Sequence, residues 1–212
     1  MTYDKDYYEG DSSNYSLFGG YTGLSLRMCR FFVYRKAISI IKRHKTRGKL
    51  LDLGCAYGFW AEFSRKRGFL SSGCDISGFA ISEARQRFSY IDFLRMDIEK
   101  PFVFRDGEFD VITAFDVLEH CKNLEFVLSE IKRVLNPEGV LLVTVPDTDL
   151  FSEEKDRDPT HVWYMNMSGW ENTFMQNGFE VKESIIFPSI LRRLNPGWCV
   201  RFILLKHSPI DS

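Results

Sequence analysis

The sequence has no long apolar run. None of its stretches approaches the roughly 20 apolar residues that a membrane-spanning helix needs, and residues 1–8 are acidic and aromatic. A secretory leader would require an apolar segment at this end of the chain. We therefore expect a soluble, cytoplasmic protein that does not insert into a membrane.

Paired cysteines are also missing. The five cysteines are scattered along the chain, and no two of them form a C-x-x-C pair. This spacing argues against a disulfide framework and against a cysteine zinc site, and it fits a reducing compartment.

The chain has no excess of basic residues. It carries 28 basic and 29 acidic residues, a formal net charge of −1. Phosphate contacts dominate the affinity of nucleic-acid-binding proteins, so a nucleic-acid partner is not expected. The densest basic stretch, residues 35–49, follows a helical pattern. A solvated helix face is the simpler interpretation of that stretch, and a surface for RNA or anionic lipid is the alternative.

What the sequence does contain is a regular alternation of strand and helix patterns. Residues 24–44 carry apolar side chains at helical spacing: Leu26, Cys29, Phe32, Val33, Ala37, Ile40 and Ile41. After Gly48, strands are predicted at 49–53, 69–74, 91–96, 109–115 and 140–145, and helices at 59–66, 78–88 and 124–135. Such alternation predicts an α/β, doubly wound, mostly parallel sheet that binds ligands at the carboxyl ends of its strands.

The last third of the chain changes character. A helix is predicted at 168–177, a strand opens at residues 178–181, and a final apolar run covers 199–205. Two late strands without a clear helix between them predict an antiparallel C-terminal hairpin, which makes the sheet seven-stranded. We divide the chain into an N-terminal arm and cap helix (1–47) and a cofactor-binding domain (48–212).

The central motif is the segment LLDLGCAYG at residues 50–58. A strand runs into a turn bounded by Gly54 and Gly58 and then into a helix, so the backbone can approach a ligand closely and the helix N-terminus faces it. Asp52 stands inside the apolar strand. A buried carboxylate needs partners, and we expect the N–H groups of the loop to brace it.

Two acidic residues follow the next two strands. Asp75 lies 21 residues after Gly54, where a carboxylate accepts hydrogen bonds from ribose hydroxyls. Its structural alternative is a helix N-cap, for which Ser77 competes. Asp97 follows the third strand, and its carboxylate could accept from an adenine amino group while Met96 and Ile98 flank the ring.

Together these residues resemble the class I S-adenosylmethionine-dependent methyltransferases, over residues 48–146 and more weakly to about 182. The string FDVITAFDVLEH at 109–120 is similar to the D-V-L-E-H version of the fourth-strand motif seen in many small-molecule methyltransferases, and RVLNPEGVL at 133–141 matches the segment that follows it. The resemblance implies S-adenosylmethionine as cofactor. It places around the cofactor Asp52, Gly54, Cys55, Ala56, Gly58, Asp75, Ile76, Met96, Asp97, Ile98, Phe115, Asp116 and Val117.

The chain departs from the family at one position of the loop, where Ala56 replaces a frequent glycine. We expect Ala56 to be tolerated there with a negative φ. A nicotinamide dehydrogenase is the main rival within the same fold. The sequence lacks the G-x-G-x-x-G fingerprint of that class and carries Asp52 and Asp116 instead.

Methyl transfer from a sulfonium depends mostly on alignment, and a general base is needed only if the acceptor loses a proton. The catalytic candidates are Asp116, expected at the cofactor pocket, and His161, expected at the acceptor site. The alternatives are helix capping for Asp116 and a loop-anchoring role for His161. Glu119 and His120 form with Asp116 a D-x-x-E-H arrangement that could bind a metal. A structural histidine is the preferred interpretation, and no metal site is expected.

The arm at residues 1–22 contains tyrosines and glycines, and it is either a lid over the cofactor or a disordered leader.

Taken together, these motifs predict a methyltransferase acting on a small-molecule acceptor, with oxygen favoured over nitrogen or carbon. The alternatives are methylation of RNA or protein, and a non-catalytic cofactor-binding protein of the same fold. The oligomeric state is left open.

Overall fold

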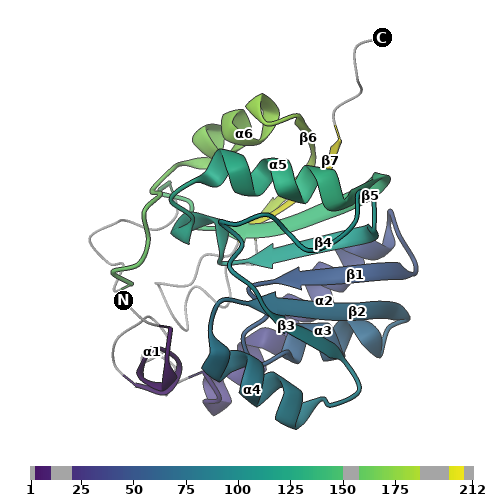
Figure 1. Cartoon of the computed structure of the whole chain (residues 1–212). Helices are drawn as coiled ribbons and strands as arrows, with labels where there is room; N and C mark the ends of the chain where they lie inside the picture. Colours follow the sequence, from purple (N-terminus) through teal and green to yellow (C-terminus); the bar gives the residue numbers. More distant parts are fainter. Residues whose placement is uncertain (1–2, 11–20, 150–157, 187–200, 208–212) are drawn as a thin grey trace.

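The structure, a computed structural model, describes residues 3–10, 21–149, 158–186 and 201–207. A seven-stranded sheet in the order β3-β2-β1-β4-β5-β7-β6 forms its centre (Figure 1). The strands are β1 (Gly48–Leu53), β2 (Phe69–Asp75), β3 (Asp92–Arg95), β4 (Phe109–Phe115), β5 (Leu135–Val145), β6 (Phe179–Ile186) and β7 (Arg201–His207). The helices are α1 (Lys5–Glu9), α2 (Leu24–Lys42), α3 (Phe59–Arg65), α4 (Gly78–Arg87), α5 (Leu124–Val134) and α6 (Met167–Gln176), with a 3₁₀ turn, η2 (Leu118–His120).

The pairing of the strands confirms the predicted fold class. Strands β1 to β5 pair in parallel with one another, and β7 runs antiparallel to both β5 and β6. The connection between β6 and β7, residues 187–200, lies outside the described residues. The carboxyl ends of the parallel strands meet at one edge of the sheet, and α1 lies beyond that edge (Figure 1).

Two apolar layers hold the helices to the sheet, because successive side chains of a strand face opposite sides. On β5, Leu141 and Val143 pack in the layer that includes α5 and α6. Val140 and Leu142 pack in the layer that includes α2 and α3. The run of β-branched and leucine residues at 140–145 is therefore buried on both faces, as a strand in the middle of a sheet covered by helices requires.

Most of the predicted stripe of α2 is buried, and one member of it is wrong. Leu26, Val33, Ala37, Ile40 and Ile41 are buried, whereas Phe32 is 48% exposed. Successive residues of a helix are turned by about 100°, so Phe32 falls beside the buried stripe and not on it. There it packs edge-on against Phe31, which is also exposed. The side chain of Cys29 lies outside the described part of the structure.

Strand β5 begins earlier than predicted. The segment Asn136-Pro137-Glu138-Gly139, which falls between the predicted helix at 124–135 and the predicted strand at 140–145, lies within β5. Leu135 pairs with Phe109 of β4 ahead of a register shift, and regular pairing resumes at Val140. An irregularity in the pairing of β4 with β5 thus carries turn-type residues inside a strand.

Candidate functional site

A cavity of about 230 Å³ opens at the carboxyl edge of the sheet. Residues that follow β1, β2, β3 and β4 line one side of it, and α1, α2 and the segment leading into α2 line the other. The lining contains all of the predicted cofactor residues except Gly58: Asp52, Gly54, Cys55, Ala56, Asp75, Ile76, Met96, Asp97, Ile98, Phe115, Asp116 and Val117. The sheet therefore gathers residues 52–117 at one place, as a doubly wound fold requires.

The loop between β1 and α3 owes its shape to left-handed backbone at three positions. Gly54 has φ 68°, Ala56 has φ 45° and Gly58 has φ 76°. The negative φ expected for Ala56 is wrong. A non-glycine residue in this region carries a strain of about 1–2 kcal/mol, and the Ala56 N–H is held in place by Asp75 Oδ2 at 2.9 Å.

The two glycines of the loop serve different contacts. A Cβ at Gly54 would lie 2.3 Å from Val117 Cγ2, and one at Gly58 would lie 2.4 Å from the Phe93 ring. Gly54 therefore lets the loop approach the segment after β4 at the cavity. Gly58 lets the start of α3 pack against β3, and it is not part of the cavity wall.

Asp75 is the most completely fixed polar group of the cavity. Its carboxylate accepts hydrogen bonds from the backbone N–H groups of Ala56 (2.9 Å) and Ser77 (2.8 Å) and from the side chain of Tyr8. Burial raises the pKa of Asp75, and these hydrogen bonds act against that rise. Ser77 is the N-cap of α4, so the capping alternative for Asp75 falls away.

The partners expected for Asp52 are wrong. Its Oδ1 accepts a hydrogen bond from the Thr113 hydroxyl on β4 (3.0 Å), which in turn accepts from Trp60 Nε1 (2.9 Å). The loop N–H that we expected Asp52 to bind is taken by Asp75. Burial raises the pKa of Asp52 well above its ordinary value, against the Thr113 bond.

Asp97 stands at the cavity in an Asx turn. Its Oδ1 accepts from the Glu99 N–H at 3.0 Å, and its side chain is 31% exposed. Asp97 lines the cavity, and so do its neighbours Met96, Ile98 and Glu99. This part of the wall is the predicted adenine side.

The N-terminal arm covers the cavity. Tyr7 and Tyr8 on α1 and Tyr21 before α2 are buried and line it. Tyr8 packs against Tyr57 with ring centroids 5.2 Å apart, and Tyr7 donates to Asp158 Oδ2 at 2.8 Å. The described part of the arm is therefore ordered against the cavity and is not a disordered leader, and its role as a lid over the cofactor stays a prediction. Residues 11–20, including Asn14 and Tyr15, lie outside the described residues.

Arg30 is a cavity residue that we did not predict. It is 8% exposed, its guanidinium lies 4.6 Å from the Tyr21 ring centroid and 4.4 Å from that of Phe59, and its Nη1 is buried without a hydrogen-bond partner among the described residues. The signal for it was present. Arg30 shares the buried stripe of α2 with Leu26, Val33 and Ala37, and a basic residue on an apolar stripe has a specific reason to be there.

Asp116 closes the wall after β4 in a left-handed conformation, φ 55°. Its Oδ1 accepts from the Thr144 hydroxyl at 2.9 Å, and its N–H donates to the Thr144 carbonyl at 3.1 Å. Burial raises the pKa of Asp116, while Thr144 and the nearby His161 act in the other direction. Asp116 thus lies in the cavity as expected, beside a histidine.

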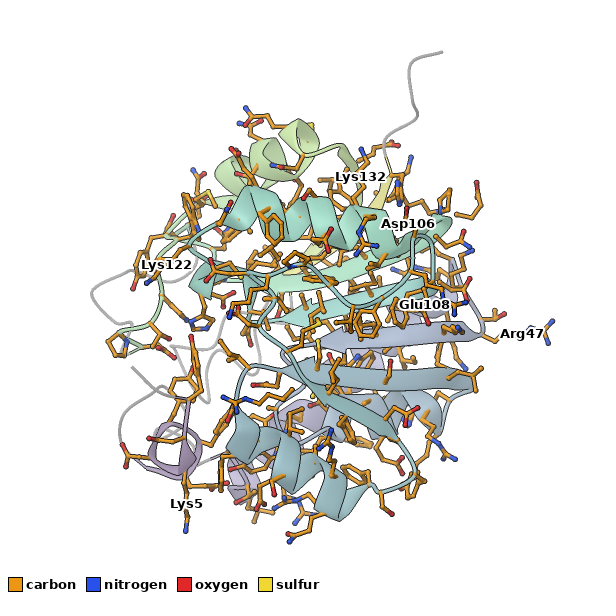
Figure 2. The ribbon with its side chains drawn as sticks, viewed as in Figure 1. Lys5, Arg47, Asp106, Glu108, Lys122 and Lys132 are labelled. Atoms are coloured by element: carbon orange, nitrogen blue, oxygen red, sulfur yellow. The ribbon has the colours of Figure 1, made fainter. Side chains whose placement is uncertain are left out.

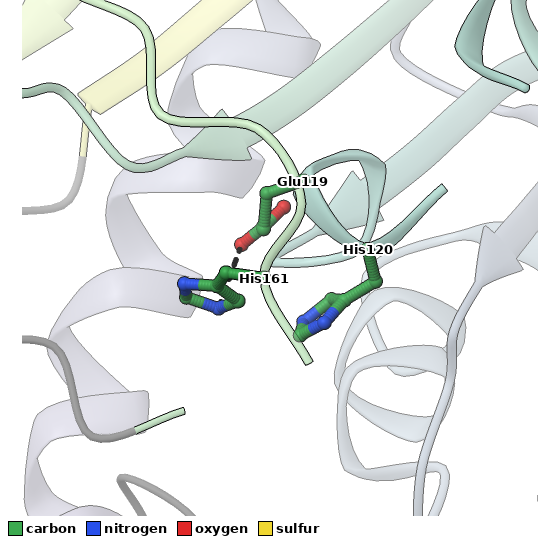
Figure 3. A group of neighbouring side chains, drawn as sticks. All are labelled: Glu119, His120 and His161. Atoms are coloured by element: carbon green, nitrogen blue, oxygen red, sulfur yellow. Dashed lines mark ion pairs between the residues drawn. The ribbon is translucent and has the colours of Figure 1, made fainter. Parts of the chain in front are cut away.

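Glu119, His120 and His161 form a cluster next to this wall (Figure 3). Each offers one ligand-type atom, and these atoms lie within 4.8 Å of one another. His120 lines the cavity, Glu119 is fully buried, and the His161 ring stands behind His120 at a centroid distance of 4.6 Å. His161 is therefore one layer behind the cavity lining rather than part of it.

A family model described as a methyltransferase domain matches residues 27–184. A protein of Mycolicibacterium smegmatis named as an S-adenosylmethionine-dependent methyltransferase is 28% identical over 145 residues, which cover 67% of this chain and 56% of its own. The ubiquinone biosynthesis O-methyltransferase of Pasteurella multocida is 32% identical over 106 residues, 44% of each chain. The chain thus spans about half the length of these curated relatives.

The fold recurs in solved structures. A methyltransferase of Haloferax volcanii, solved in complex with the Trm112 methyltransferase activator, aligns with a TM-score of 0.74 at 16% identity over 88% of this chain and 93% of its own. No helix among the described residues is both long and apolar enough to span a membrane. Because the family model covers most of the chain and the sheet carries the expected cavity, the chain belongs to the family of S-adenosylmethionine-dependent methyltransferase domains.

Proposed function

We propose that this protein transfers a methyl group from S-adenosylmethionine to an oxygen of a small-molecule acceptor. The observation that carries the proposal is the covered cavity at the carboxyl edge of the sheet, roofed by the tyrosines of α1. A roofed cavity of this kind suits a small ligand more than a polymer. The Pasteurella relative is named as an O-methyltransferase, which favours oxygen as the acceptor atom.

Charge supports a small-molecule acceptor over a nucleic acid. The lining carries five carboxylates, from Asp52, Asp75, Asp97, Glu99 and Asp116, against the single guanidinium of Arg30. The basic stretch at the end of α2 leads into the start of β1. Figure 2 shows Arg47 of this stretch at the amino edge of the sheet, opposite α1 and its Lys5. The basic face is therefore far from the cavity, where an RNA backbone would need it.

The positions of the lining residues favour one direction for the cofactor in the cavity. Asp75 would accept from the ribose hydroxyls, and Met96, Asp97 and Ile98 would enclose the adenine. The cofactor also carries an α-carboxylate, and Arg30 supplies the buried cation that a carboxylate seeks. This direction leaves the sulfonium methyl toward the β4 end of the cavity, where Asp116 and His120 lie.

The reaction is an in-line displacement. The acceptor oxygen attacks the methyl carbon, the carbon–sulfur bond breaks, and its electron pair stays on sulfur, which yields S-adenosylhomocysteine. A hydroxyl acceptor must also lose its proton. Asp116 on the wall and His161 behind it are the groups placed to assist that loss. Alignment of the acceptor inside the closed cavity supplies the larger part of the rate enhancement.

The test follows a labelled methyl group. The protein, labelled S-adenosylmethionine and a cell extract separated into metabolite, RNA and protein fractions are incubated together, and label is measured in each fraction. We expect label in the metabolite fraction as an alkali-stable methyl ether or an alkali-labile methyl ester. His161→Ala should lower this transfer about 100-fold or more and leave affinity for S-adenosylhomocysteine unchanged.

Two results would refute the proposed function, and a third would refute only the role of His161. Label confined to the RNA or protein fraction would show that the acceptor is a macromolecule and not a small molecule. Tight cofactor binding with no transfer into any fraction would favour a non-catalytic cofactor-binding protein. Unchanged turnover of His161→Ala with the true acceptor would remove His161 from the site.

A further inference from the structure

We propose that Glu119, His120 and His161 bind a divalent transition-metal ion at the cavity wall, where the ion coordinates the acceptor oxygen. This departs from the expectation, drawn from the sequence, that no metal is bound. The D-x-x-E-H pattern of the sequence grouped Glu119 and His120 with Asp116. The structure instead brings them together with His161, which follows His120 after 40 intervening residues, 121 to 160. The role of the ion in transfer rests on the proposed function; its binding does not.

The spacing of the three side chains suits a metal ion. Bonds of about 2.0–2.2 Å to nitrogen and oxygen hold the ligand atoms of one ion about 3–4 Å apart. His161 Nε2 and Glu119 Oε1 lie 3.9 Å apart, which is too long for a direct hydrogen bond. All three ligand atoms lie within 4.8 Å of one another, so the cluster needs to contract by only about 1 Å to hold an ion.

Backbone hydrogen bonds bring the two parts of the cluster together. The N–H groups of Val162 and Trp163 donate to the Glu119 carbonyl at 2.8 and 3.2 Å. Trp163 Nε1 donates to the Cys121 carbonyl at 2.6 Å. The segment that carries His161 is therefore clamped to the turn that carries Glu119 and His120. A site held in this way is organised before its ligand arrives.

A chain of hydrogen bonds sets the protonation of His120. The Thr160 hydroxyl lies 2.5 Å from Asp158 Oδ1 and 2.8 Å from His120 Nδ1. A carboxylate only accepts hydrogen bonds, so the Thr160 hydroxyl donates its hydrogen bond to Asp158 and accepts one from the N–H at His120 Nδ1. This assignment leaves the lone pair of His120 on Nε2, the state in which an imidazole binds a metal. Metal-binding histidines generally have such a partner on their second nitrogen.

The donor set selects the class of ion. Two imidazoles and one carboxylate suit Mn²⁺, Fe²⁺, Co²⁺ or Zn²⁺, whereas Ca²⁺ and Mg²⁺ prefer oxygen ligands. Three protein ligands leave coordination positions open. Because His120 lines the cavity, an open position can face the acceptor.

An ion held by Glu119, His120 and His161 would supply Lewis-acid chemistry to the acceptor hydroxyl in the transfer step. The hydroxyl proton passes to the Asp116 carboxylate, the oxygen attacks the methyl carbon, and the carbon–sulfur electron pair goes to sulfur. No oxidation or reduction occurs. His161 then serves as a metal ligand, and Asp116 alone takes the proton.

The experiment titrates the full chain, after treatment with EDTA and dialysis, with Mn²⁺ and follows the electron paramagnetic resonance signal of the free ion. We expect one bound Mn²⁺ per chain, displaced by Zn²⁺ and not by an equal concentration of Mg²⁺. Glu119→Gln and His161→Ala should lose this binding. Thr160→Val keeps all three proposed ligands but removes the hydroxyl that bonds His120 Nδ1 and Asp158 Oδ1, and it should weaken the binding about 10–100-fold.

His44→Gln is the matched control, because His44 Nε2 lies 2.9 Å from the Glu183 carboxylate in a histidine–glutamate pair outside the cluster. It should bind Mn²⁺ as the unaltered chain does. Absence of Mn²⁺ binding, or equal binding by Glu119→Gln and His161→Ala, would overturn the proposal. If either variant fails to fold by circular dichroism, the unaltered chain and Thr160→Val decide the question by the same criteria.

Binding of S-adenosylhomocysteine to the metal-free protein separates the two proposals. Retained cofactor binding without any Mn²⁺ site would sink the metal site and leave the proposed function intact. In the labelled-methyl assay, EDTA should abolish transfer and Mn²⁺ should restore it; EDTA-insensitive transfer would refute the catalytic role of the ion.

Discussion

The two halves of the cavity are built in different ways. At the β1–β3 half, backbone geometry shapes the wall: Gly54 and Ala56 take left-handed conformations, and Asp75 binds two backbone N–H groups. At the β4–β5 half, side chains from segments far apart in the sequence meet. Asp116 binds Thr144 and His120 binds Thr160.

Under the proposed function, this difference corresponds to the two ligands of a methyltransferase: the β1–β3 half is the donor half, and the β4–β5 half is the acceptor half. The donor is the same molecule in every member of the family, so a wall fixed by a short sequence motif suits it. The acceptor varies, and a wall of side chains on separate segments can change without disturbing the motif. Loops on a rigid scaffold commonly carry such variable function.

Among substitutions in the donor half, Asp75→Ala should lower affinity for S-adenosylhomocysteine the most. Hydrogen bonds to a charged group contribute about 1.5–3 kcal/mol each, so the loss of two ribose contacts should lower affinity for S-adenosylhomocysteine about 100-fold or more. Isothermal titration calorimetry measures it. Asp92→Ala, at an exposed carboxylate at the start of β3, is the control and should bind normally. Equal affinities in the two variants would contradict the ribose role.

Arg30→Met tests the amino-acid end of the donor half. We expect affinity for S-adenosylhomocysteine to fall about 10–100-fold, because one charge-assisted interaction is lost. Affinity for 5′-methylthioadenosine, which has no carboxylate, should not change. The melting temperature should hold or rise, since the variant removes a buried charge whose Nη1 has no partner in the described structure. A parallel loss for both ligands would point to a packing role instead.

Acid should weaken the donor half at a higher pH than an ordinary aspartate would. Burial raises the pKa of Asp75 in the folded protein, so the free protein takes up a proton, and gains stability relative to the unfolded chain, as the pH falls through that raised value. Ribose binding needs the ionised form. Affinity for S-adenosylhomocysteine should therefore fall by up to about tenfold per pH unit below the pKa of Asp75, and Asp75→Asn should remove this dependence. A pH profile shared by Asp75→Asn would assign the titration to another group.

The smallest effect concerns the strained loop. Ala56→Gly should raise the free energy of unfolding by about 1 kcal/mol, because glycine adopts a φ of 45° without the strain of a Cβ. Ala61→Gly in α3 should lower it by about 1 kcal/mol or more. Urea denaturation measures both. A destabilised Ala56→Gly would mean that the Ala56 methyl group, buried among the tyrosines, contributes more than the strain costs.

The sequence was sufficient for the donor half, because its signals are local. Strand and helix periods, the turn after Gly54 and an acid after the second strand follow from neighbouring residues, and the structure gathers Gly54, Ala56 and Asp75 at the cavity. The φ of Ala56 and the partner of Asp52 were not predicted correctly. Thr113 lies on a different strand, and only the order of the strands in the sheet brings the two together.

The covering side of the site could not be predicted in the same way. Helix α1 has five residues, too few for an isolated helix to be stable in water, and its tyrosines are held by contacts with Tyr57 and Asp158. The joining of Glu119 with His161 likewise depends on backbone hydrogen bonds between separate segments. Arg30 was the one missed residue with a local signal, its place on the buried stripe of α2.

Calorimetric titration of the unaltered chain with S-adenosylhomocysteine and, separately, with NAD tests the central claim most directly. A cavity built around Asp75, Asp97 and the 54–58 loop should bind S-adenosylhomocysteine with a dissociation constant on the order of micromolar and give no heat with NAD. Binding of NAD, or no binding of S-adenosylhomocysteine, would contradict the assignment of this cavity to the methyl donor.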